Sequence, residues 1–350
     1  AVGCRIYAPV GEHEDLLAYL VRRLLENGAN NSFVNNIVDK AVPLESLLRD
    51  PVETVEAASG QRNQAIPLPQ DIYRHSGSER SNRQNSRGFD LTDTKTLAHL
   101  SHGMDVFWGQ HTASLLAQTN SITMTNPASR QETVSFLTID NSGDIDVKLG
   151  KAYAAFPAWT ARPIRERIKF LHELAEALEE HMVELVTLCI KEAGKTAADA
   201  VAEIREAVDF CRYYAASAED LNQREQSQCL DAPKSYGVVL CISPWNFPLA
   251  IFLGQITAAL VAGNTVIAKP AEQASLIAKY VVALMVGCGL PKNVVELVLG
   301  PGKPIGEKLV PDKRIAAVMF TGSTQTARWL AQALAKRCEY DVPLIAETGG

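Results

Sequence analysis

The sequence lacks paired cysteines. Its seven cysteines are scattered at positions 4, 189, 211, 229, 241, 288 and 338, and no two of them form a CxxC motif. An odd number of scattered cysteines argues against a disulfide framework and against a zinc site, and it predicts reduced thiols. We therefore expect a cytoplasmic protein without a metal site.

The sequence also lacks a strong excess of either charge. It has 34 basic and 40 acidic residues, a net charge of −6, and a pI near 5.7. A protein that binds nucleic acid or an anionic membrane electrostatically normally carries a basic patch or stripe. We therefore expect no nucleic-acid binding by this segment.

Charged side chains are missing altogether between Tyr236 and Ala268. About 20 apolar residues are enough to cross a bilayer, so this run has sufficient length. However, Pro244, Asn246, Pro248 and the pair at 263–264 divide it into pieces the length of a strand or a short helix. The run therefore predicts buried elements of a globular fold rather than a membrane span.

The two ends of the sequence suggest a segment of a longer chain. It begins at Ala1 rather than methionine and stops at a glycine pair with no closing element. Residues 4–7 are typical of a strand, and leucines at helical spacing predict a helix from about Leu16 to Leu25. One strand and one helix cannot bury each other, so we expect them to be the last unit of an upstream domain.

The middle of the sequence changes from polar to helical. Residues 43–126 are polar and irregular, and we expect 76–88 (SGSERSNRQNSRG) to be an exposed or mobile linker, followed by a short helix over 92–102. Between Phe156 and Leu221 the apolar spacing predicts three consecutive helices.

Short, nearly all-apolar runs appear after Ser235, with helical segments between them. They are YGVVLCI (236–242), NTVIAKP (264–270), NVVELVL (293–299), IAAVMF (315–320) and VPLIA (342–346). Strands of this kind are expected in a parallel sheet that helices cover on both faces. The fold class is therefore α/β, with a doubly wound parallel sheet.

Ligands of open parallel sheets bind beyond the carboxyl ends of the strands, so the residues after each run are the candidates. Gly302, Gly306 and Ser323 open helices there and offer backbone amides to a phosphate, although glycines equally serve turns. The GxGxxG fingerprint does not follow the first strand, where SPWNFP stands instead. Lys269 could bind ribose hydroxyls or a 2′-phosphate, or could simply extend from a strand end to solvent.

Four ordered motifs at these strand ends, PWNFP, KPAE, FTGS and ETGG, strongly resemble the aldehyde dehydrogenase superfamily over residues 121–350. The resemblance implies a thiolate that attacks an aldehyde, a hydride that passes to NAD, and a water that hydrolyses the thioester. It also implies that the parallel sheet is the NAD-binding domain of that family.

The resemblance assigns roles to individual residues. Asn246 would donate its amide to the oxyanion, and Glu347 would be the general base for the hydrolytic water. As structural alternatives, Asn246 would bond its own backbone in a turn, and Glu347 would cap one. The residues expected at the cofactor are Trp245, Lys269, Glu272, Gly302, Gly306 and Ser323, with Lys269 and Glu272 on the adenosine ribose, Ser323 on the pyrophosphate, and the ring of Trp245 serving packing rather than catalysis.

The nucleophilic cysteine of the family follows the ETGG glutamate by a few dozen residues and would lie beyond Gly350. Cys241 falls within an expected strand and Cys288 on an apolar helix, so both are interpreted as core thiols. We therefore expect the segment alone to bind a dinucleotide but not to oxidise aldehydes.

Residues 5–34 carry a second resemblance, to the final strand and helix of the flavin-dependent proline dehydrogenase (β/α)8 barrel of the proline utilization A (PutA) family. In that family the paired helix arginines, here Arg22 and Arg23, hold the proline carboxylate, and the matching tyrosines are Tyr7 and Tyr19. A guanidinium suits a carboxylate. The structural alternative is an exposed helix in which Arg22 pairs with Glu26.

The order of these parts implies a bifunctional enzyme of proline catabolism. Residues 1–42 would end the proline dehydrogenase barrel, 43–120 would form a linker region, and 121–350 would begin the aldehyde dehydrogenase domain. The resemblance implies oxidation of proline to pyrroline-5-carboxylate with FAD and of glutamate semialdehyde to glutamate with NAD. It further implies a homo-oligomer, with peripheral membrane or quinone contact in the full-length protein.

Two alternatives remain open at this stage. One is a single-function NAD(P)-dependent aldehyde dehydrogenase whose first 120 residues are an N-terminal extension. The other is a bifunctional enzyme that also regulates transcription, through an N-terminal DNA-binding domain outside this segment.

Overall fold

The computed structural model describes residues 16, 41, 43, 45, 48, 50–57, 66–73, 83–115, 121–228, 234–337 and 342–349. The chain forms two compact units, residues 1–68 with 349–350, and residues 69–348. In the first unit, the Asp50 carboxylate accepts a hydrogen bond at 2.8 Å from the Val52 amide at the start of α4 (Pro51–Ala57). The strand expected over 4–7 and the proposed proline-site residues Tyr7, Tyr19, Arg22 and Arg23 lie outside the described residues.

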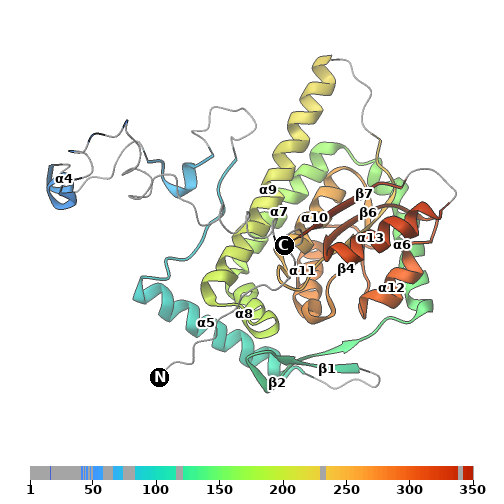
Figure 1. Ribbon diagram of the computed structural model, residues 1–350, viewed down its shortest axis with the longest axis horizontal. Coiled ribbons are helices and arrows are strands. Elements are labelled where there is room, and N and C mark those ends of the chain that lie inside the picture. Colours follow the sequence, from blue (N-terminus) through green and yellow to red (C-terminus); the bar gives the residue numbers. More distant parts are fainter. Residues whose placement is uncertain are drawn as a thin grey trace. The chain divides into compact units, whose positions relative to one another are not determined.

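A five-stranded parallel sheet forms the centre of the second unit, in the order β5-β4-β3-β6-β7 (Figure 1). All four neighbouring pairs are parallel. The strands are β3 (Val238–Ile242), β4 (Thr265–Lys269), β5 (Val295–Leu297), β6 (Ile315–Gly322) and β7 (Leu344–Thr348). The five strands expected from the sequence are confirmed. The strand order reverses between β3 and β6, and such a switch point is where open α/β sheets bind ligands.

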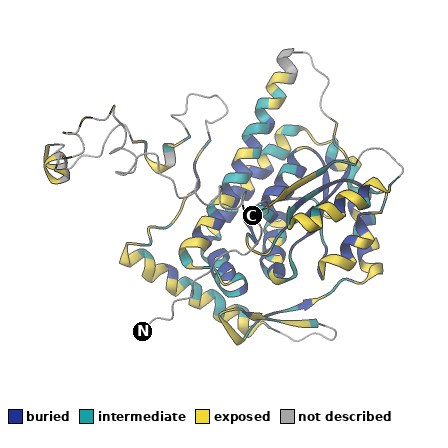
Figure 2. Cartoon of the chain, in the orientation of Figure 1, coloured by how far each residue is buried: buried dark blue, intermediate teal, exposed yellow. Residues whose placement is uncertain are grey.

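Helices cover both faces of the sheet, which confirms the doubly wound fold class. One face packs in an apolar cluster with the helices α7 (Ile164–Glu180), α8 (Met182–Ala193), α9 (Ala197–Gln228), α10 (Ala250–Val261) and α11 (Ser275–Gly287). The other face packs with α6 (Ser142–Thr160), α12 (Gly302–Leu309) and α13 (Thr324–Ala335). The central strands β3 and β4 are buried between these layers, whereas β7, at the edge of the sheet, is mostly exposed (Figure 2).

The uncharged run at 236–268 is divided into β3, α10 and β4, as its prolines and glycine predicted. Each piece is buried because the sheet is covered on both sides. Among the described residues, no helix combines the length and the apolarity that crossing a bilayer requires.

The helices expected from the sequence are present, but the neighbouring helices α5 and α6 have other bounds than expected. Helices α7, α8 and α9 are the three consecutive helices expected, and Leu171, Leu174 and Leu178 are fully buried along the predicted stripe. Helix α6 begins upstream of that region. Helix α5 (Thr94–Ala113) continues eleven residues past His102, where the short helix was expected to end. Its first turn is capped by Asp93, which accepts hydrogen bonds from the amides of Lys95 and Thr96.

A hairpin of β1 (Ser121–Asn126) and β2 (Ser129–Thr138) pairs antiparallel. The expectation of irregular structure through Asn126 is therefore wrong for β1. Its side chains are mostly exposed or half-buried, so the strand lacks the apolar pattern that marks the strands of the buried sheet. The antiparallel partner, rather than burial, keeps the strand extended.

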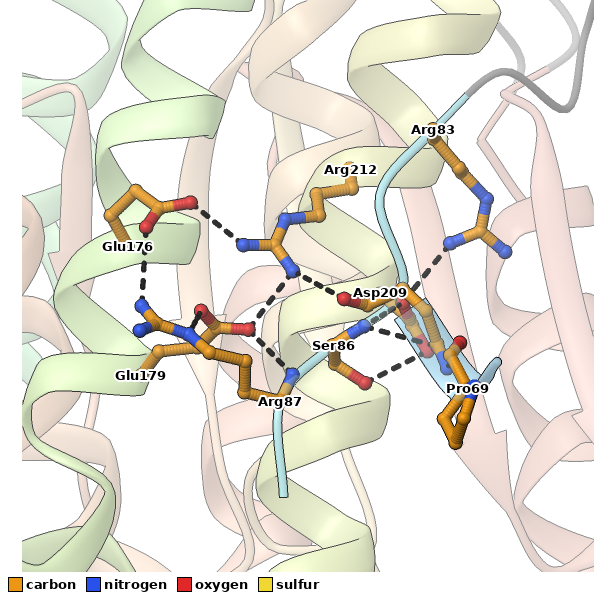
Figure 3. A network of polar contacts seen from close by, with 9 residues as sticks. Pro69, Arg83, Ser86, Arg87, Glu176, Glu179, Asp209 and Arg212 are labelled. Carbon is orange, nitrogen blue, oxygen red and sulfur yellow. Dashed lines mark hydrogen bonds and ion pairs between the residues drawn. The ribbon is translucent and has the colours of Figure 1, made fainter. Parts of the chain in front are cut away.

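The expectation of an exposed or mobile linker is wrong around Asn85 and Ser86, which are each 5% exposed. Figure 3 shows this stretch held between side chains of α7 and α9. The Asp209 carboxylate of α9 accepts hydrogen bonds from Arg83 at 3.1 Å and from the amide and hydroxyl of Ser86 at 3.3 and 3.2 Å. These partners satisfy the polar groups that made the stretch look solvent-exposed in sequence.

A buried arginine also holds the polar stretch around Asn85. Arg212 of α9 is 3% exposed and donates to Glu179 at 2.9 Å, to Glu176 at 2.7 Å and to the Asn85 carbonyl at 3.1 Å. The Arg87 amide donates to Glu179 at 2.8 Å. Burial by itself raises the pKa of Glu179, but the hydrogen bonds from Arg212 and Arg87 outweigh it and hold the pKa below its usual value.

Candidate functional site

The carboxyl ends of the parallel strands bring the candidate residues to one edge of the sheet. Ile242, the last residue of β3, pairs with Lys269 on one side and with Phe320 on the other. Phe320 pairs in turn with Ala346, and the next row pairs Thr321 with Glu347. Adjacent strands are about 4.8 Å apart, so β7 lies roughly 9–10 Å from β3 along this edge.

The turn that carries Asn246 connects β3 to α10. It begins at Ser243, whose amide donates to the Lys269 carbonyl at 3.2 Å and so joins the ends of β3 and β4. Asn246 itself is exposed. Trp245 is 63% exposed, so the described residues leave much of its ring uncovered, and its expected packing role stays a prediction.

A buried glutamate of α9 holds the end of this turn. The Glu203 carboxylate accepts hydrogen bonds from the amides of Leu249 at 3.0 Å and Ala250 at 2.8 Å. These amides open α10 and have no partner within the helix, and a negative charge there also interacts favourably with the helix dipole. The side chain of Glu203 is fully buried and pairs with Lys195 at 2.7 Å. The Lys195 ammonium also lies 4.7 Å from the ring centre of Phe247, within the turn.

Sequence reasoning missed Glu203 and Lys195. The available signal was a charged residue inside an apolar stretch of α9, where Val201 and Ile204 flank Glu203 closely and are buried with it. A carboxylate at such a position requires a partner inside the protein. The sequence could not indicate which element supplies it.

Glu347 lies on the same face of the sheet as α10. It lines a cavity of about 70 Å³ together with Phe210 and Tyr214 of α9 and Gln255 of α10. The Gln255 side-chain amide donates to the Ile242 carbonyl at 3.2 Å and to the Thr321 hydroxyl at 3.1 Å. Helix α10 is therefore attached to the ends of both β3 and β6, next to the strand that carries Glu347.

Burial raises the pKa of the Tyr214 phenol, and the neighbouring Tyr213 and the negative charge of Glu347 raise it further. The cavity therefore presents a neutral phenol and aromatic walls behind the carboxylate. The turn that carries Asn246 and the end of β7 that carries Glu347 therefore lie at the same edge of the sheet, although the two residues are 101 residues apart in sequence.

A larger cavity, of about 420 Å³, lies on the opposite face between α12 and α13. Lys269, Gly302 and Gly306, three of the residues expected at the cofactor, line it together. Thr326 and Trp329 of α13 complete the wall, and sequence reasoning did not identify either of them. Their side chains are on a helix with ordinary amphipathic spacing, so only packing indicates that they face this cavity.

Ser323 lies at the entrance to α13 rather than in the wall of this cavity. Its hydroxyl accepts from the Thr326 amide at 3.2 Å and so caps the helix. The Ser323 and Thr326 hydroxyls are 2.9 Å apart. Ser323 is thus connected to the cavity through Thr326.

Lys269 is a buried lysine with one charged partner. It is 4% exposed, and its ammonium lies 3.6 Å from the Glu272 carboxylate, at the start of η3 (Glu272–Ala274). Burial lowers the pKa of Lys269, and the Glu272 carboxylate opposes that effect. The ammonium also lies 3.7 Å from the place that a Cβ would occupy at Gly302, so it sits beside the first residue of α12.

Gly306 has a packing role in the same cavity. A Cβ at this position would approach the Trp329 ring to 3.3 Å, tighter than nearly all such contacts in proteins. The glycine therefore lets the indole lie against α12. The cavity combines an aromatic wall with a buried ammonium, and the Glu272 carboxylate lies beside that ammonium. This combination suits a flat base attached to a sugar with hydroxyl groups.

The described cysteines are not activated. Cys189, Cys211 and Cys241 are buried, and burial raises the pKa of each thiol. Cys288 is partly exposed, and burial together with Glu173 and Glu180 raises its pKa as well. Nucleophilic cysteines have lowered pKa values, so none of these four thiols suits that role.

Family models match the chain in two places. The model described as "Aldehyde dehydrogenase family" matches residues 115–350, and the model described as "Proline dehydrogenase" matches residues 1–36. The first match covers both cavities and the candidate residues from Trp245 to Glu347.

Individual relatives agree with both matches. The chain is 45% identical to the bifunctional protein PutA of Escherichia coli, over 99% of this chain and 26% of that protein. It is 31% identical to a 1-pyrroline-5-carboxylate dehydrogenase of Staphylococcus saprophyticus, over 77% of this chain and 56% of that protein. A crystal structure of a mutant of proline utilization A from Bradyrhizobium japonicum matches with a TM-score of 0.66 and 40% identity, over 98% of this chain and 32% of that chain.

The chain thus spans about a quarter of the length of the bifunctional relative from Escherichia coli. The family model covers more than half of the chain and coincides with the doubly wound sheet and its carboxyl edge. The chain belongs to the aldehyde dehydrogenase family.

Proposed function

We propose that residues 121–350 are the cofactor-binding part of an NAD-dependent dehydrogenase that oxidises glutamate semialdehyde to glutamate. We further propose that the same polypeptide oxidises proline to pyrroline-5-carboxylate with FAD. The observation that supports the first proposal is that the turn carrying Asn246 follows β3 at the same edge of the sheet where β7 carries Glu347.

Asn246 is proposed to stabilise negative charge on the substrate oxygen. When a thiolate adds to an aldehyde carbon, the carbonyl oxygen becomes an oxyanion, and a side-chain amide can donate a hydrogen bond to it. Such a donor is worth about 2.7–4 kcal/mol in comparable sites. The exposed position of Asn246 in a turn whose two ends are both bonded supports this role.

Glu347 is proposed to be the general base. A carboxylate can take a proton from a water molecule as that water attacks the thioester. The side chain lines a cavity of about 70 Å³, large enough for water, with Gln255 and Tyr214 nearby. The nucleophile of this scheme is proposed to be a cysteine other than the four described ones, because burial raises the pKa of each of those.

NAD is proposed to bind in the cavity between α12 and α13. Lys269 and Glu272 would hold ribose hydroxyls, and the amides at the start of α12, near Gly302, would face phosphate. Gly306 and Trp329 would cover the base, and Ser323 would assist at the start of α13. NAD, when bound, supplies the hydride acceptor.

The proline dehydrogenase activity is supported by the family model at residues 1–36 and by the bifunctional relatives. Arg22 and Arg23 are proposed to bind the proline carboxylate, with Tyr7 and Tyr19 beside them. FAD would bind to parts of the barrel outside residues 1–36.

Activity measurements on the full-length protein test both proposals. We expect NAD reduction with glutamate semialdehyde and dye reduction with proline. Aldehyde oxidation without bound FAD or proline-dependent dye reduction would favour a single-function aldehyde dehydrogenase. Absence of NAD-linked aldehyde oxidation would reject the first proposal.

A further inference from the structure

Two buried glutamates in the helical layer make the same unusual contact. Glu203 of α9 caps α10 by accepting the amides of Leu249 and Ala250. Glu192 of α8 caps α11 by accepting the amides of Leu276 at 2.7 Å and Ile277 at 2.8 Å. They are 1% and 5% exposed, respectively. In both cases the carboxylate comes from a different helix rather than from the helix that it caps.

Each capped helix follows a different part of the proposed site. Helix α10 begins directly after the turn that carries Asn246. Helix α11 begins directly after η3, whose first residue is Glu272, the partner of Lys269. Glu203 therefore lies behind the oxyanion turn, and Glu192 lies behind the proposed ribose site.

The two turns are held from both sides. On the strand side, the Ser243 amide donates to the Lys269 carbonyl at 3.2 Å and joins the ends of β3 and β4. On the helix side, each carboxylate accepts two amides, and hydrogen bonds to charged groups are stronger than neutral ones. A short turn with both ends held cannot shift along the helix axis, so the caps set where the intervening side chains lie.

The surroundings of the two caps differ in one respect. Glu203 has an ion-pair partner, Lys195, whose ammonium also contacts the Phe247 ring inside the oxyanion turn. Near Glu192, the Ser275 hydroxyl donates to the Glu272 carbonyl at 2.8 Å and so connects the start of α11 to the ribose site. The Glu203 cap thus has a second contact within its turn, whereas near Glu192 the link to the ribose site is made by Ser275, next to the capped amides.

We propose that Glu203 and Glu192 are positioning residues with separate tasks: Glu203 places the Asn246 amide for the chemical step, and Glu192 places Lys269 and Glu272 for binding NAD. Neither glutamate contacts the reacting groups. The inference rests on the proposed function and adds which part of the reaction each cap serves.

The variants Glu203→Gln and Glu192→Gln in the full-length protein separate the two tasks. Glutamine keeps the size of the side chain but removes its charge and replaces one oxygen with a donor. In Glu192→Gln only one of the two amides keeps an acceptor, because each amide binds a different oxygen. In Glu203→Gln both amides keep their shared oxygen, which is now uncharged, and the ion pair with Lys195 is lost. For Glu203→Gln, we expect hydride transfer at saturating NAD to slow by about 10- to 100-fold, the effect of a displacement near 1 Å. We expect its Kd for NAD to stay within about twofold.

For Glu192→Gln, we expect the reverse result. The Kd for NAD should rise by about tenfold, while hydride transfer at saturating NAD stays within about twofold. Each variant should therefore keep the property that the other one loses, and the property it keeps shows that it is folded. Binding is measured by quenching of tryptophan fluorescence and hydride transfer by single-turnover absorbance.

Glu179→Gln is the matched control. Its side chain is equally buried and also binds a backbone amide, but its partners, Arg87 and Arg212, touch neither turn. We expect no change in hydride transfer or NAD affinity. If Glu203→Gln does not fold, Lys195→Gln replaces it, because this variant leaves the Glu203 cap but removes the contact to Phe247; hydride transfer should again slow selectively.

The proposal is overturned if Glu203→Gln, or Lys195→Gln in its place, weakens NAD binding as much as it slows hydride transfer, or changes neither. It is also overturned if Glu192→Gln slows hydride transfer at saturating NAD. These results differ from failure of the proposed function, in which the unaltered protein itself would show no NAD-dependent aldehyde oxidation.

Discussion

Arg212 and Glu179 form an ion pair at 2.9 Å in which the two side chains are 4% and 1% exposed. This pair joins α9 to α7, and both partners also bind the polar stretch around Asn85. The attachment of that stretch therefore depends on two charges that water does not reach.

Arg212→Met should be strongly destabilising. The substitution removes the arginine and leaves the Glu179 charge buried without its main partner, which costs about 3–5 kcal/mol in comparable pairs. Thermal or denaturant unfolding of the full-length protein measures the loss. The double variant Arg212→Met with Glu179→Leu removes both charges and should recover a large part of it; equal instability of the single and double variants would show that lost packing is the cause.

Asn246→Ala should slow aldehyde oxidation without loosening the cofactor. The amide is proposed to donate to the developing oxyanion, so its removal is expected to lower kcat by about 10²- to 10³-fold. The Kd for NAD should stay nearly constant, because the proposed cofactor cavity lies on the other face of the sheet. A parallel loss of NAD affinity would identify Asn246 as a structural turn residue instead.

Lys269→Met should weaken NAD binding. The ammonium is buried and is proposed to donate to ribose hydroxyls, and losing a charged hydrogen bond of about 1.5–3 kcal/mol corresponds to roughly 10- to 100-fold in Kd. Lys303→Met is the matched control, since Lys303 lines the same cavity but its side chain is 85% exposed. Equal effects of the two substitutions would mean that the cavity attracts the cofactor by its general charge.

Glu192 should give the protein a pH-dependent stability. Burial raises the pKa of Glu192 from 4.5 to about 7, against the opposing hydrogen bonds from Ile277 and Leu276. Because the folded pKa is above the unfolded one, the stabilising contribution is fully present below pH 4.5 and is lost as the pH rises through 7. The shift is worth about 3 kcal/mol.

The comparison that isolates this effect is with Glu192→Gln, which cannot titrate. The unfolding free energy of the unaltered protein, minus that of the variant, should fall between pH 5 and pH 8 when measured by denaturant titration. A difference that stays constant over this range would contradict the raised pKa.

Arg22→Ala or Arg23→Ala should abolish proline oxidation alone. If these arginines hold the proline carboxylate, glutamate semialdehyde supplied from outside should still be oxidised with NAD. Both rates are measured on the same full-length preparation. A loss of both activities would indicate misfolding rather than a substrate contact.

The sequence by itself determined the parallel sheet and the helices that cover it. The runs that became β3, β4, β5, β6 and β7 are short, β-branched and almost free of charge, a composition that is typical of a parallel sheet covered by helices. The apolar stripe of α7 was equally readable, because helical spacing places its leucines on one side. The strand ends, and with them Asn246, Lys269 and Glu347, could be located for the same reason.

Only the tertiary structure decided which polar residues are buried and what they hold. Asn85 and Ser86 belong to a stretch that is polar throughout, yet the carboxylates of α7 and α9 satisfy it inside the protein. Glu203 caps a helix that begins 47 residues later, and Trp329 closes a cavity against Gly306. A polar or aromatic side chain has no fixed environment of its own; partners distant in sequence supply it, so local patterns could not reveal these contacts.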